Sequence, residues 1–367
     1  MKDPRVNNLA KLLVNYSINV QPDETVLLSG SVPALPLIRE TYREIILAGG
    51  LPLVILQDED LEEIFLRDSN EVQLKYVPEP TKLIFETYDS LISIRGAGNT
   101  RALSGVDPKR QTIVQAANRE LMGLYMKRSA EGSFKWVTTL FPTLAHAQDA
   151  DMSLSDFEDF VYGACYADKS DPVSEWRKIS AQQQKLVDWL AGKDKIVVKG
   201  PNINMQLSIN GRTFINSDGR KNMPSGEIFT GPVENSVNGW VKFSYPAIVS
   251  GREVNGIELV FEDGKVTKAS AVKNEPFLLQ MLDTDQGAKY LGEFAVGTNQ
   301  SIQQFTKSIL YDEKIGGTIH MALGNGYAET GSINKSAIHW DMICDMRDGG
   351  EIFVDDELFY RSGKFMI

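Results

Sequence analysis

The feature that most constrains the fold of this chain is a change in its hydrophobic pattern near residue 192. Before that point, short apolar runs alternate with segments of helical periodicity, which is typical of an α/β layered domain with a largely parallel sheet. Beyond it, apolar and polar residues alternate singly, which favours a strand-rich, mixed α/β domain. The 367 residues exceed the usual size of one hydrophobic core. We therefore predict an α+β chain with an α/β domain at 1–192 and a second domain at 193–367.

Local patterns divide the first half into expected elements. A helical pattern occupies residues 33–48, where Gly49-Gly50 ends it, and a longer one occupies residues 172–190. Short apolar runs predict buried strands at 25–29, 53–56, 91–94 and 136–141. The segment Gly192-Lys193-Asp194 then interrupts the pattern, and we place the domain boundary there.

Two turn signals in the second half predict hairpins. Residues 205–209 alternate between apolar and polar up to Asn210-Gly211, and residues 257–261 do so up to Asp263-Gly264. Both dipeptides suit the positive φ angles of a two-residue hairpin turn. A helical stretch is expected at residues 276–290.

Charge and cysteine content narrow the class of protein. The net charge of −11 argues against nucleic acid as a partner, because a negative surface repels phosphate. No apolar run approaches the roughly 18 residues that span a bilayer, and the first residues lack an apolar signal region. Cys165 and Cys344 lie far apart, so we expect two inert thiols. These observations predict a cytoplasmic protein that binds neither nucleic acid nor membrane.

Two of the three histidines, His320 and His339, lie close together in the region that is densest in strand signals. Strand alternation places His339 and Asp341 on one face, with apolar neighbours on the other. The same alternation sets His320 between Thr318 and Ala322, again with apolar residues opposite. We expect two strands to present their histidines to one cavity.

Imidazole and carboxylate side chains in this arrangement are suitable ligands for divalent transition metals. A His-x-Asp pair with another histidine also occurs in mononuclear non-haem iron oxygenases. In the common oxygenase arrangement, however, the distal histidine follows the pair, and no histidine follows Asp341 here. A third reading is a non-enzymatic metal- or ligand-binding module, in which the metal is structural and its site closed.

At these motifs the sequence resembles the aminopeptidase T and aminopeptidase S group of M29 metallopeptidases. The resemblance covers the second half closely and the first half more loosely. In the second half it rests on residues 224–232, 291–295, 312–313, 320–324, Tyr327 and 339–341, and in the first half on 156–160 and 171–173.

The resemblance implies a set of metal ligands around two divalent ions (Zn, Co, Mn or Mg), with a carboxylate that bridges them. The implied ligands are Glu227, Glu293, His320, His339 and Asp341, with Glu313 as a further one. Two more residues separate Glu313 from His320 here than in the better-known members, which weakens the assignment of Glu313, and we expect Gly316-Gly317 to accommodate the insertion.

The resemblance also implies an activity. A metalloaminopeptidase of this group removes N-terminal residues from short peptides, using a water shared by the two metals. Tyr327 matches a tyrosine that hydrogen-bonds the substrate or the tetrahedral intermediate, and either Glu227 or Glu293 is the candidate proton acceptor. The implied assembly is a homodimer in which the catalytic domains pair.

Overall fold

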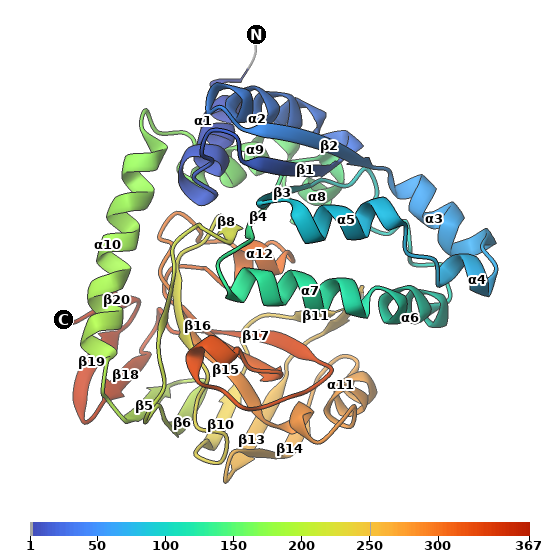
Figure 1. Cartoon of the computed structure of the whole chain (residues 1–367). Helices are drawn as coiled ribbons and strands as arrows, with labels where there is room; N and C mark the ends of the chain where they lie inside the picture. Colours follow the sequence, from blue (N-terminus) through green and yellow to red (C-terminus); the bar gives the residue numbers. More distant parts are fainter. Residues whose placement is uncertain (1–2, 250) are drawn as a thin grey trace. The chain divides into compact units, whose positions relative to one another are not determined.

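A computed structural model of the chain describes residues 3–249 and 251–367 (Figure 1). These residues form two compact units. Unit 1 contains residues up to Trp176 together with Gly219–Pro224, and unit 2 contains Arg177–Asp218 and Ser225–Ile367. The predicted division into domains at residue 192 stays a prediction.

The helices are mostly in unit 1. The α-helices are α1 (Pro4–Leu12), α2 (Leu35–Leu47), α3 (Glu59–Asp68), α4 (Glu71–Leu74), α5 (Glu79–Thr87), α6 (Pro108–Ala117), α7 (Arg119–Ala130), α8 (Leu144–Asp149), α9 (Leu154–Ala164), α10 (Pro172–Leu190), α11 (Glu275–Leu282) and α12 (Ile309–Asp312). A π-helical turn, η1 (Leu13–Ser17), follows α1, and short 3-10 turns are η2 (Val32–Ala34), η3 (Gly287–Lys289) and η4 (Ala328–Thr330).

The strands are mostly in unit 2. Unit 1 contains β1 (Thr25–Ser31), β2 (Leu51–Gln57), β3 (Ser90–Arg95), β4 (Lys135–Leu140) and β8 (Asn222–Met223). Unit 2 contains β5 (Lys195–Gly200), β6 (Ile203–Ser208), β7 (Ile215–Ser217), β9 (Glu227–Thr230), β10 (Asn238–Lys242), β11 (Ala247–Val249), β12 (Arg252–Val254), β13 (Glu258–Glu262), β14 (Lys265–Ser270), β15 (Leu291–Gly297), β16 (Thr318–Gly324), β17 (His339–Asp345), β18 (Glu351–Val354), β19 (Glu357–Arg361) and β20 (Lys364–Phe365).

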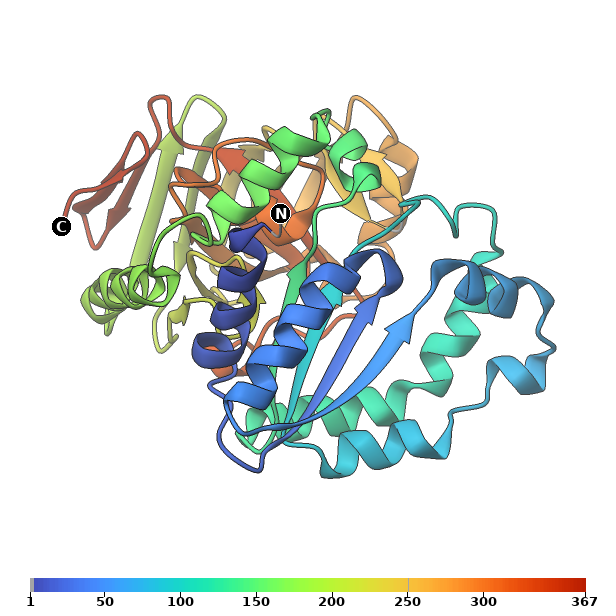
Figure 2. The ribbon, with the colours of Figure 1, turned by 90° about the horizontal axis from the view of Figure 1, so that it is seen from above.

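Unit 1 is built on a parallel five-stranded sheet with the order β2-β1-β3-β4-β8 (Figure 2). Strand β1, between β2 and β3, is buried along its length except at its two ends, because helices cover both faces of a sheet of this kind. Helix α2 packs against β1 and β2. The predicted strands, and the predicted helices at 33–48 and 172–190, are therefore confirmed as β1 to β4, α2 and α10.

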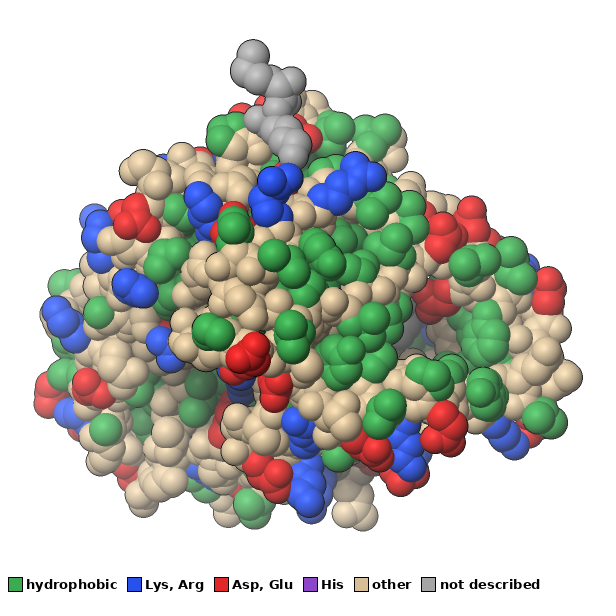
Figure 3. Space-filling view, turned by 45° about the horizontal axis from the view of Figure 1, so that its top comes forward, with side chains coloured by type: hydrophobic (Ala, Val, Ile, Leu, Met, Phe, Trp, Pro, Cys, Tyr) green, Lys and Arg blue, Asp and Glu red, His purple; other side chains and the backbone are tan. Residues whose placement is uncertain are grey.

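The edge strand β2 leaves apolar side chains in contact with solvent. Leu51, Leu53, Ile55 and Leu56 are exposed, and the end of α2 adds Leu47. Figure 3 shows hydrophobic side chains gathered on one face of the molecule. No strand of the described residues pairs with the free edge of β2, and an uncovered edge is a surface where strands of other chains can add.

Besides the two-stranded sheet β11-β12, unit 2 contains two larger antiparallel sheets that share one hydrophobic core. The larger has the order β14-β13-β10-β6-β5-β18-β19-β20, and the smaller has the order β17-β16-β15-β9-β7. Side chains from both sheets belong to the same cluster of buried residues, for example Val198 and Met205 from the larger sheet and Met321 and Trp340 from the smaller. One face of the smaller sheet is therefore used for packing, which leaves the other for polar side chains.

The two predicted hairpins have different outcomes. Asp263-Gly264 joins the paired strands β13 and β14, with φ angles of 48° and 83°, as predicted. The prediction of a hairpin at Asn210-Gly211 is wrong. A tight turn does form there, since Arg212 N donates to Ile209 O at 2.9 Å, but β6 and β7 on either side belong to different sheets. Strand β6 instead pairs with β5 and β10, and its alternating apolar residues are the ones that face the core.

The helix predicted at residues 276–290 is shorter than expected. It ends at Leu282, and only the 3-10 turn η3 follows. The carboxylate of Asp285 accepts hydrogen bonds from Ala288 N, Ser336 Oγ and Ala337 N, which stabilises a turn at this point in place of a further helical turn. Among the described residues, no helix is long and apolar enough to cross a membrane.

Candidate metal centre

The five side chains expected to bind metal come from four neighbouring strands of the smaller sheet in unit 2. Glu227 begins β9, Glu293 lies in β15, His320 in β16, and His339 and Asp341 in β17. Since these strands are adjacent in the order β17-β16-β15-β9, residues as far apart in sequence as Glu227 and His320 become neighbours in space.

The pairing register places the side chains on one face. Glu293 lies opposite Ala322, which in turn lies opposite Asp341, and Ala295 lies opposite His320. Directly opposed residues of an antiparallel pair point to the same side of the sheet. The intervening residues Ala295 and Ala322 are small, so they leave room above the sheet for the longer polar side chains.

The other face of the same strands is apolar. Phe294, Ile319, Met321, Trp340 and Met342 are buried in the hydrophobic core of unit 2. The prediction that one face of the two histidine strands packs and the other presents polar groups is confirmed. Each such buried side chain contributes about 1.5–3 kcal/mol to folding, so the core holds the site strands in register.

Glu293 owes its position to an irregularity at the start of β15. The register between β15 and β16 shifts between Leu291 and Glu293. A Cβ atom on Gly292 would lie 2.3 Å from the carbonyl oxygen of Asn325, so only glycine fits this close approach. The bulge directs the Glu293 carboxylate toward the histidines.

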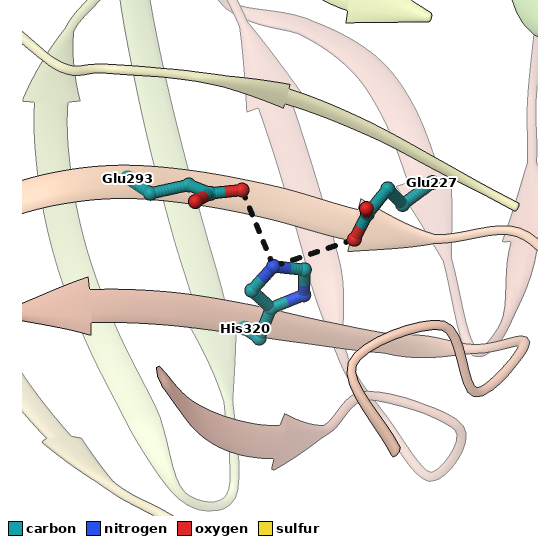
Figure 4. A group of neighbouring side chains, drawn as sticks. All are labelled: Glu227, Glu293 and His320. Carbon is teal, nitrogen blue, oxygen red and sulfur yellow. Dashed lines mark ion pairs between the residues drawn. The ribbon is translucent and has the colours of Figure 1, made fainter. Parts of the chain in front are cut away.

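The carboxylate of Glu293 lies between the two histidines. Its Oε1 is 3.4 Å from His320 Nε2, and its Oε2 is 3.3 Å from His339 Nε2. His320 Nε2 is also 3.5 Å from Glu227 Oε2, as Figure 4 shows, and His339 Nε2 is 3.5 Å from Asp341 Oδ1. Each histidine thus faces two carboxylates, and Glu293 is common to both pairs.

Backbone and amide groups orient the ligands from outside. His339 Nδ1 lies 2.7 Å from the carbonyl oxygen of Asn325, and since a carbonyl can only accept, Nδ1 carries the proton and donates it. The other ring nitrogen, Nε2, is then directed at Glu293 and Asp341, which is the usual orientation of a metal-binding histidine. Gln183 of α10 donates to the backbone oxygen of Glu227 at 3.1 Å and so supports β9.

The electrostatics of these side chains follow from burial and from their pairings. Burial alone would lower the pKa of His320, but Glu293 and Glu227 raise it to about 9. Burial would also lower the pKa of His339, but Asp341 raises it to about 12. Burial acts to raise the pKa of Asp341, yet the charge of His339 holds it at about 2. Both rings therefore carry an extra proton where a metal ion would otherwise supply the positive charge.

The side chains fit divalent metal ions. Three groups of possible ligand atoms lie within 4.8 Å of one another; they are Glu227 with Glu293 and His320, Glu293 with His339 and Asp341, and Glu313 with His320 and Asp341. Glu227 Oε2 and Asp341 Oδ1 are buried, and neither accepts a hydrogen bond from the described residues. Buried carboxylate oxygens without donors are expected where a cation satisfies them.

Two further residues from the sequence prediction lie beside this cluster. Glu313 follows α12 and forms an ion pair with its own neighbour, Lys314. The Tyr327 ring packs at 5.1 Å from the ring of His339 and at 5.5 Å from that of Phe229, and it is 38% exposed. Burial raises the pKa of Tyr327 far above neutrality, so its hydroxyl keeps its proton and can donate a hydrogen bond.

Sequence reasoning missed two residues of the site. Lys314 is fully buried, and its Nζ lies 3.7 Å from Glu227 Oε1. Gln183 lies in a helix more than 40 residues before Glu227. The Asp312-Glu313-Lys314 run is typical of an exposed surface, so the sequence held no signal that the lysine faces inward.

Comparisons with known proteins identify the family of this chain. A family model described as thermophilic metalloprotease (M29) matches residues 2–365. The chain belongs to this family. The M29 assignment confirms the family predicted from the sequence motifs, and with it a metal-dependent peptidase, which is a hydrolase.

Curated M29 relatives extend over nearly the whole chain. Aminopeptidase 2 of Geobacillus stearothermophilus is 26% identical over 94% of this chain and 93% of its own length. Aminopeptidase T of Thermus thermophilus is 25% identical over 88% of this chain and 85% of its own length. These names agree with the predicted exopeptidase class, and they disfavour the iron oxygenase and the non-enzymatic binding module.

A solved structure shares the fold. The structure titled wild-type AmpT from Thermus thermophilus superposes with a TM-score of 0.87, at 22% identity and over 99% of both chains. The predicted fold class, an α/β domain with a parallel sheet followed by a strand-rich mixed domain, is thereby confirmed.

Proposed function

We propose that this M29 protein is an aminopeptidase that removes N-terminal residues from short peptides at a centre of two divalent metal ions. The observation that carries the proposal is the position of Glu293, whose two oxygens each face a different histidine at 3.4 and 3.3 Å. A carboxylate with one oxygen toward each of two nitrogen ligands is suited to bridge two ions.

The proposed ligand sets follow from the groups of neighbouring atoms. Glu227, Glu293 and His320 would hold one ion, and Glu293, His339 and Asp341 the other. The mixture of imidazole and carboxylate suits zinc, cobalt, manganese or magnesium, with selection in the cell set by availability. When bound, such a pair of ions activates a water molecule and polarises the scissile carbonyl at neutral pH.

The protein's own residues would stabilise the developing charge, transfer the proton and bind the substrate amine. The Tyr327 hydroxyl, which stays protonated, would donate a hydrogen bond to the carbonyl oxygen as negative charge develops there. Of the two candidates, Glu227 and Glu293, the one that keeps an oxygen not bound to metal would carry the proton from the attacking water to the leaving amine. The free α-amine of the substrate would bind to the acidic centre, so that the first peptide bond of the substrate is the one cleaved. The homodimer and the cytoplasmic location stay predictions.

The test measures metal content and peptide cleavage together. The purified protein should release the N-terminal residue of a tripeptide and leave its N-acetylated form intact, lose activity on chelation, and recover it when a divalent metal is returned. Glu293→Gln and His339→Ala should lose bound metal and turnover while keeping the fold. Glu258→Gln, an exposed strand glutamate of the same unit, is the matched control and should retain both.

Either of two results would refute the proposal. One is full activity in Glu293→Gln or His339→Ala. The other is equal cleavage of the free and the N-acetylated tripeptide, which would indicate a peptidase that does not require the α-amine. A metal analysis that gives one ion per chain at full activity would refute the two-metal part alone.

A further inference from the structure

A buried lysine belongs to the metal centre. Lys314 has no exposed side-chain surface and is among the largest fully buried side chains of the described residues. Its ammonium group forms an ion pair with Glu313 and lies 3.7 Å from Glu227 Oε1. A fully buried lysine is rare and needs compensating charge, so this position is a built feature of the site.

The backbone holds Lys314 in place. Lys314 N donates to Tyr311 O at 3.0 Å, and Lys314 O accepts from Asn299 N at 3.2 Å. Gly297, at the end of β15, approaches the next residue so closely that a Cβ there would lie 2.2 Å from Ile315 O. The segment that carries Lys314 is therefore packed against the strand that carries Glu293, and the buried side chain extends toward the centre.

The position of this charge distinguishes the two proposed ligand groups. The ammonium occupies an oxygen of Glu313 and lies next to Glu227, which belongs to the group formed with Glu293 and His320. Asp341 of the other group also interacts with this charge, but no ion pair joins Lys314 to Asp341 or His339 among the described residues. A fixed positive charge a few ångströms from a divalent ion weakens its binding, and a carboxylate held by an ammonium is less available as a ligand.

We propose that Lys314 is a positioning residue that keeps Glu313 from binding metal and makes the two metal positions unequal. The ion held by Glu227, Glu293 and His320 binds weakly and exchanges, and the ion held by Glu293, His339 and Asp341 binds tightly. The inference rests on the proposed two-metal function. It assigns to Lys314 and Glu313 a role different from that of the five ligands.

The experiment titrates the chelator-stripped full-length protein with Co²⁺ and follows heat and visible absorption, which reports the coordination of the ion. Wild-type protein should bind two ions with clearly different affinities. Lys314→Met, which keeps an unbranched side chain one atom shorter and removes the charge, should tighten the weaker ion by about tenfold or more. The affinity of the tighter ion should change much less.

Glu313→Gln tests the second half of the inference. In wild-type background it leaves the ammonium without its Glu313 partner and should weaken the ion held by Glu227, Glu293 and His320 by about tenfold, through charge alone. In the Lys314→Met background it should weaken the ion that Lys314→Met had tightened by clearly more than that, because it then removes a ligand as well as a charge. This difference between the two backgrounds is a coupling that a purely structural lysine would not produce.

Three results would overturn the inference: two ions of equal affinity in wild type, unchanged or weaker binding in Lys314→Met, or an equal loss from Glu313→Gln in both backgrounds. If Lys314→Met does not fold, Lys314→Gln, which also removes the charge, takes its place, and an unchanged affinity of the weaker ion overturns the inference. Failure of the proposed function looks different, since wild-type protein would then bind no Co²⁺ at the centre and would not cleave peptides.

Discussion

At the scale of single residues, the two histidines determine how metal binding depends on pH. Their pKa values are raised to about 9 for His320 and about 12 for His339 in the metal-free site. Because a raised pKa keeps the ring protonated at neutral pH, each ion must displace a proton from the nitrogen that it binds. Metal binding is therefore coupled to proton release through the neutral range.

This coupling gives a prediction with a definite sign. Metal affinity should rise as the pH increases from 6 to 9, by about tenfold per pH unit for each proton displaced. Isothermal titration in two buffers of different ionisation enthalpy measures the protons released, and repeating it at several pH values measures the affinity. An affinity that stays constant between pH 6 and 9 would contradict the protonated histidines.

Tyr327 is the residue whose role in the reaction is easiest to separate from metal binding. Tyr327→Phe removes the hydroxyl and keeps the ring that packs against His339 and Phe229. We expect kcat to fall by about 10² to 10³ with metal content unchanged, because the lost group acts on developing charge. Tyr76→Phe, at an exposed tyrosine of unit 1, is the control. Loss of metal in Tyr327→Phe would point to a structural role instead.

At the scale of strands, the site depends on which side chains of β15, β16 and β17 are small. Ala322 lies between Glu293 and Asp341 in the pairing register and is fully buried. Ala322→Val suits a strand but adds two methyl groups on the polar face. The added methyl groups should displace the neighbouring carboxylates. We therefore expect metal affinity to fall by about tenfold or more, which is the usual effect of disturbing the residues that orient metal ligands.

Leu323, which follows Ala322 in β16, provides a control on the opposite face of the sheet. Leu323→Val removes one methylene from the hydrophobic core of unit 2, which should lower the free energy of unfolding by about 0.5–1.5 kcal/mol and leave metal affinity unchanged. Thermal unfolding and metal titration of the two variants should therefore give opposite patterns. If Leu323→Val also lost metal, the two faces would not be independent.

Strand alternation explains how much of the site was predictable. The shared face of His339 and Asp341 follows from a period of two, which is a local property of the sequence. The approach of Glu227 and Glu293 to these residues depends on the register between β9, β15 and β16. Pairing between distant strands leaves no local signal, so those two positions came from the family resemblance.

The same distinction between local and long-range effects accounts for the errors. The Asn210-Gly211 turn was predicted correctly as a turn, but which strands pair across it depends on the whole of unit 2. Lys314 was overlooked because a lysine beside a glutamate is normally solvated. Its burial arises only when the segment after α12 packs against the end of β15.

At the scale of the whole molecule, all five proposed ligands lie in unit 2. A metal that binds only the folded form stabilises that form by about 2.7 kcal/mol when its concentration is 100 times its dissociation constant. Because no proposed ligand belongs to unit 1, this stabilisation should act on the strands of the smaller sheet and not on the parallel sheet.

Hydrogen exchange measured with and without a chelator tests this localisation. Under those conditions, amides of β15, β16 and β17 that open by unfolding of unit 2 should exchange about 100-fold faster once the metal is removed. Amides of β1 and β3, in the middle of the parallel sheet, provide the internal control and should change little. An equal acceleration in both sheets would mean that the two units unfold together, so that the metal stabilises the entire chain through its effect on one of them.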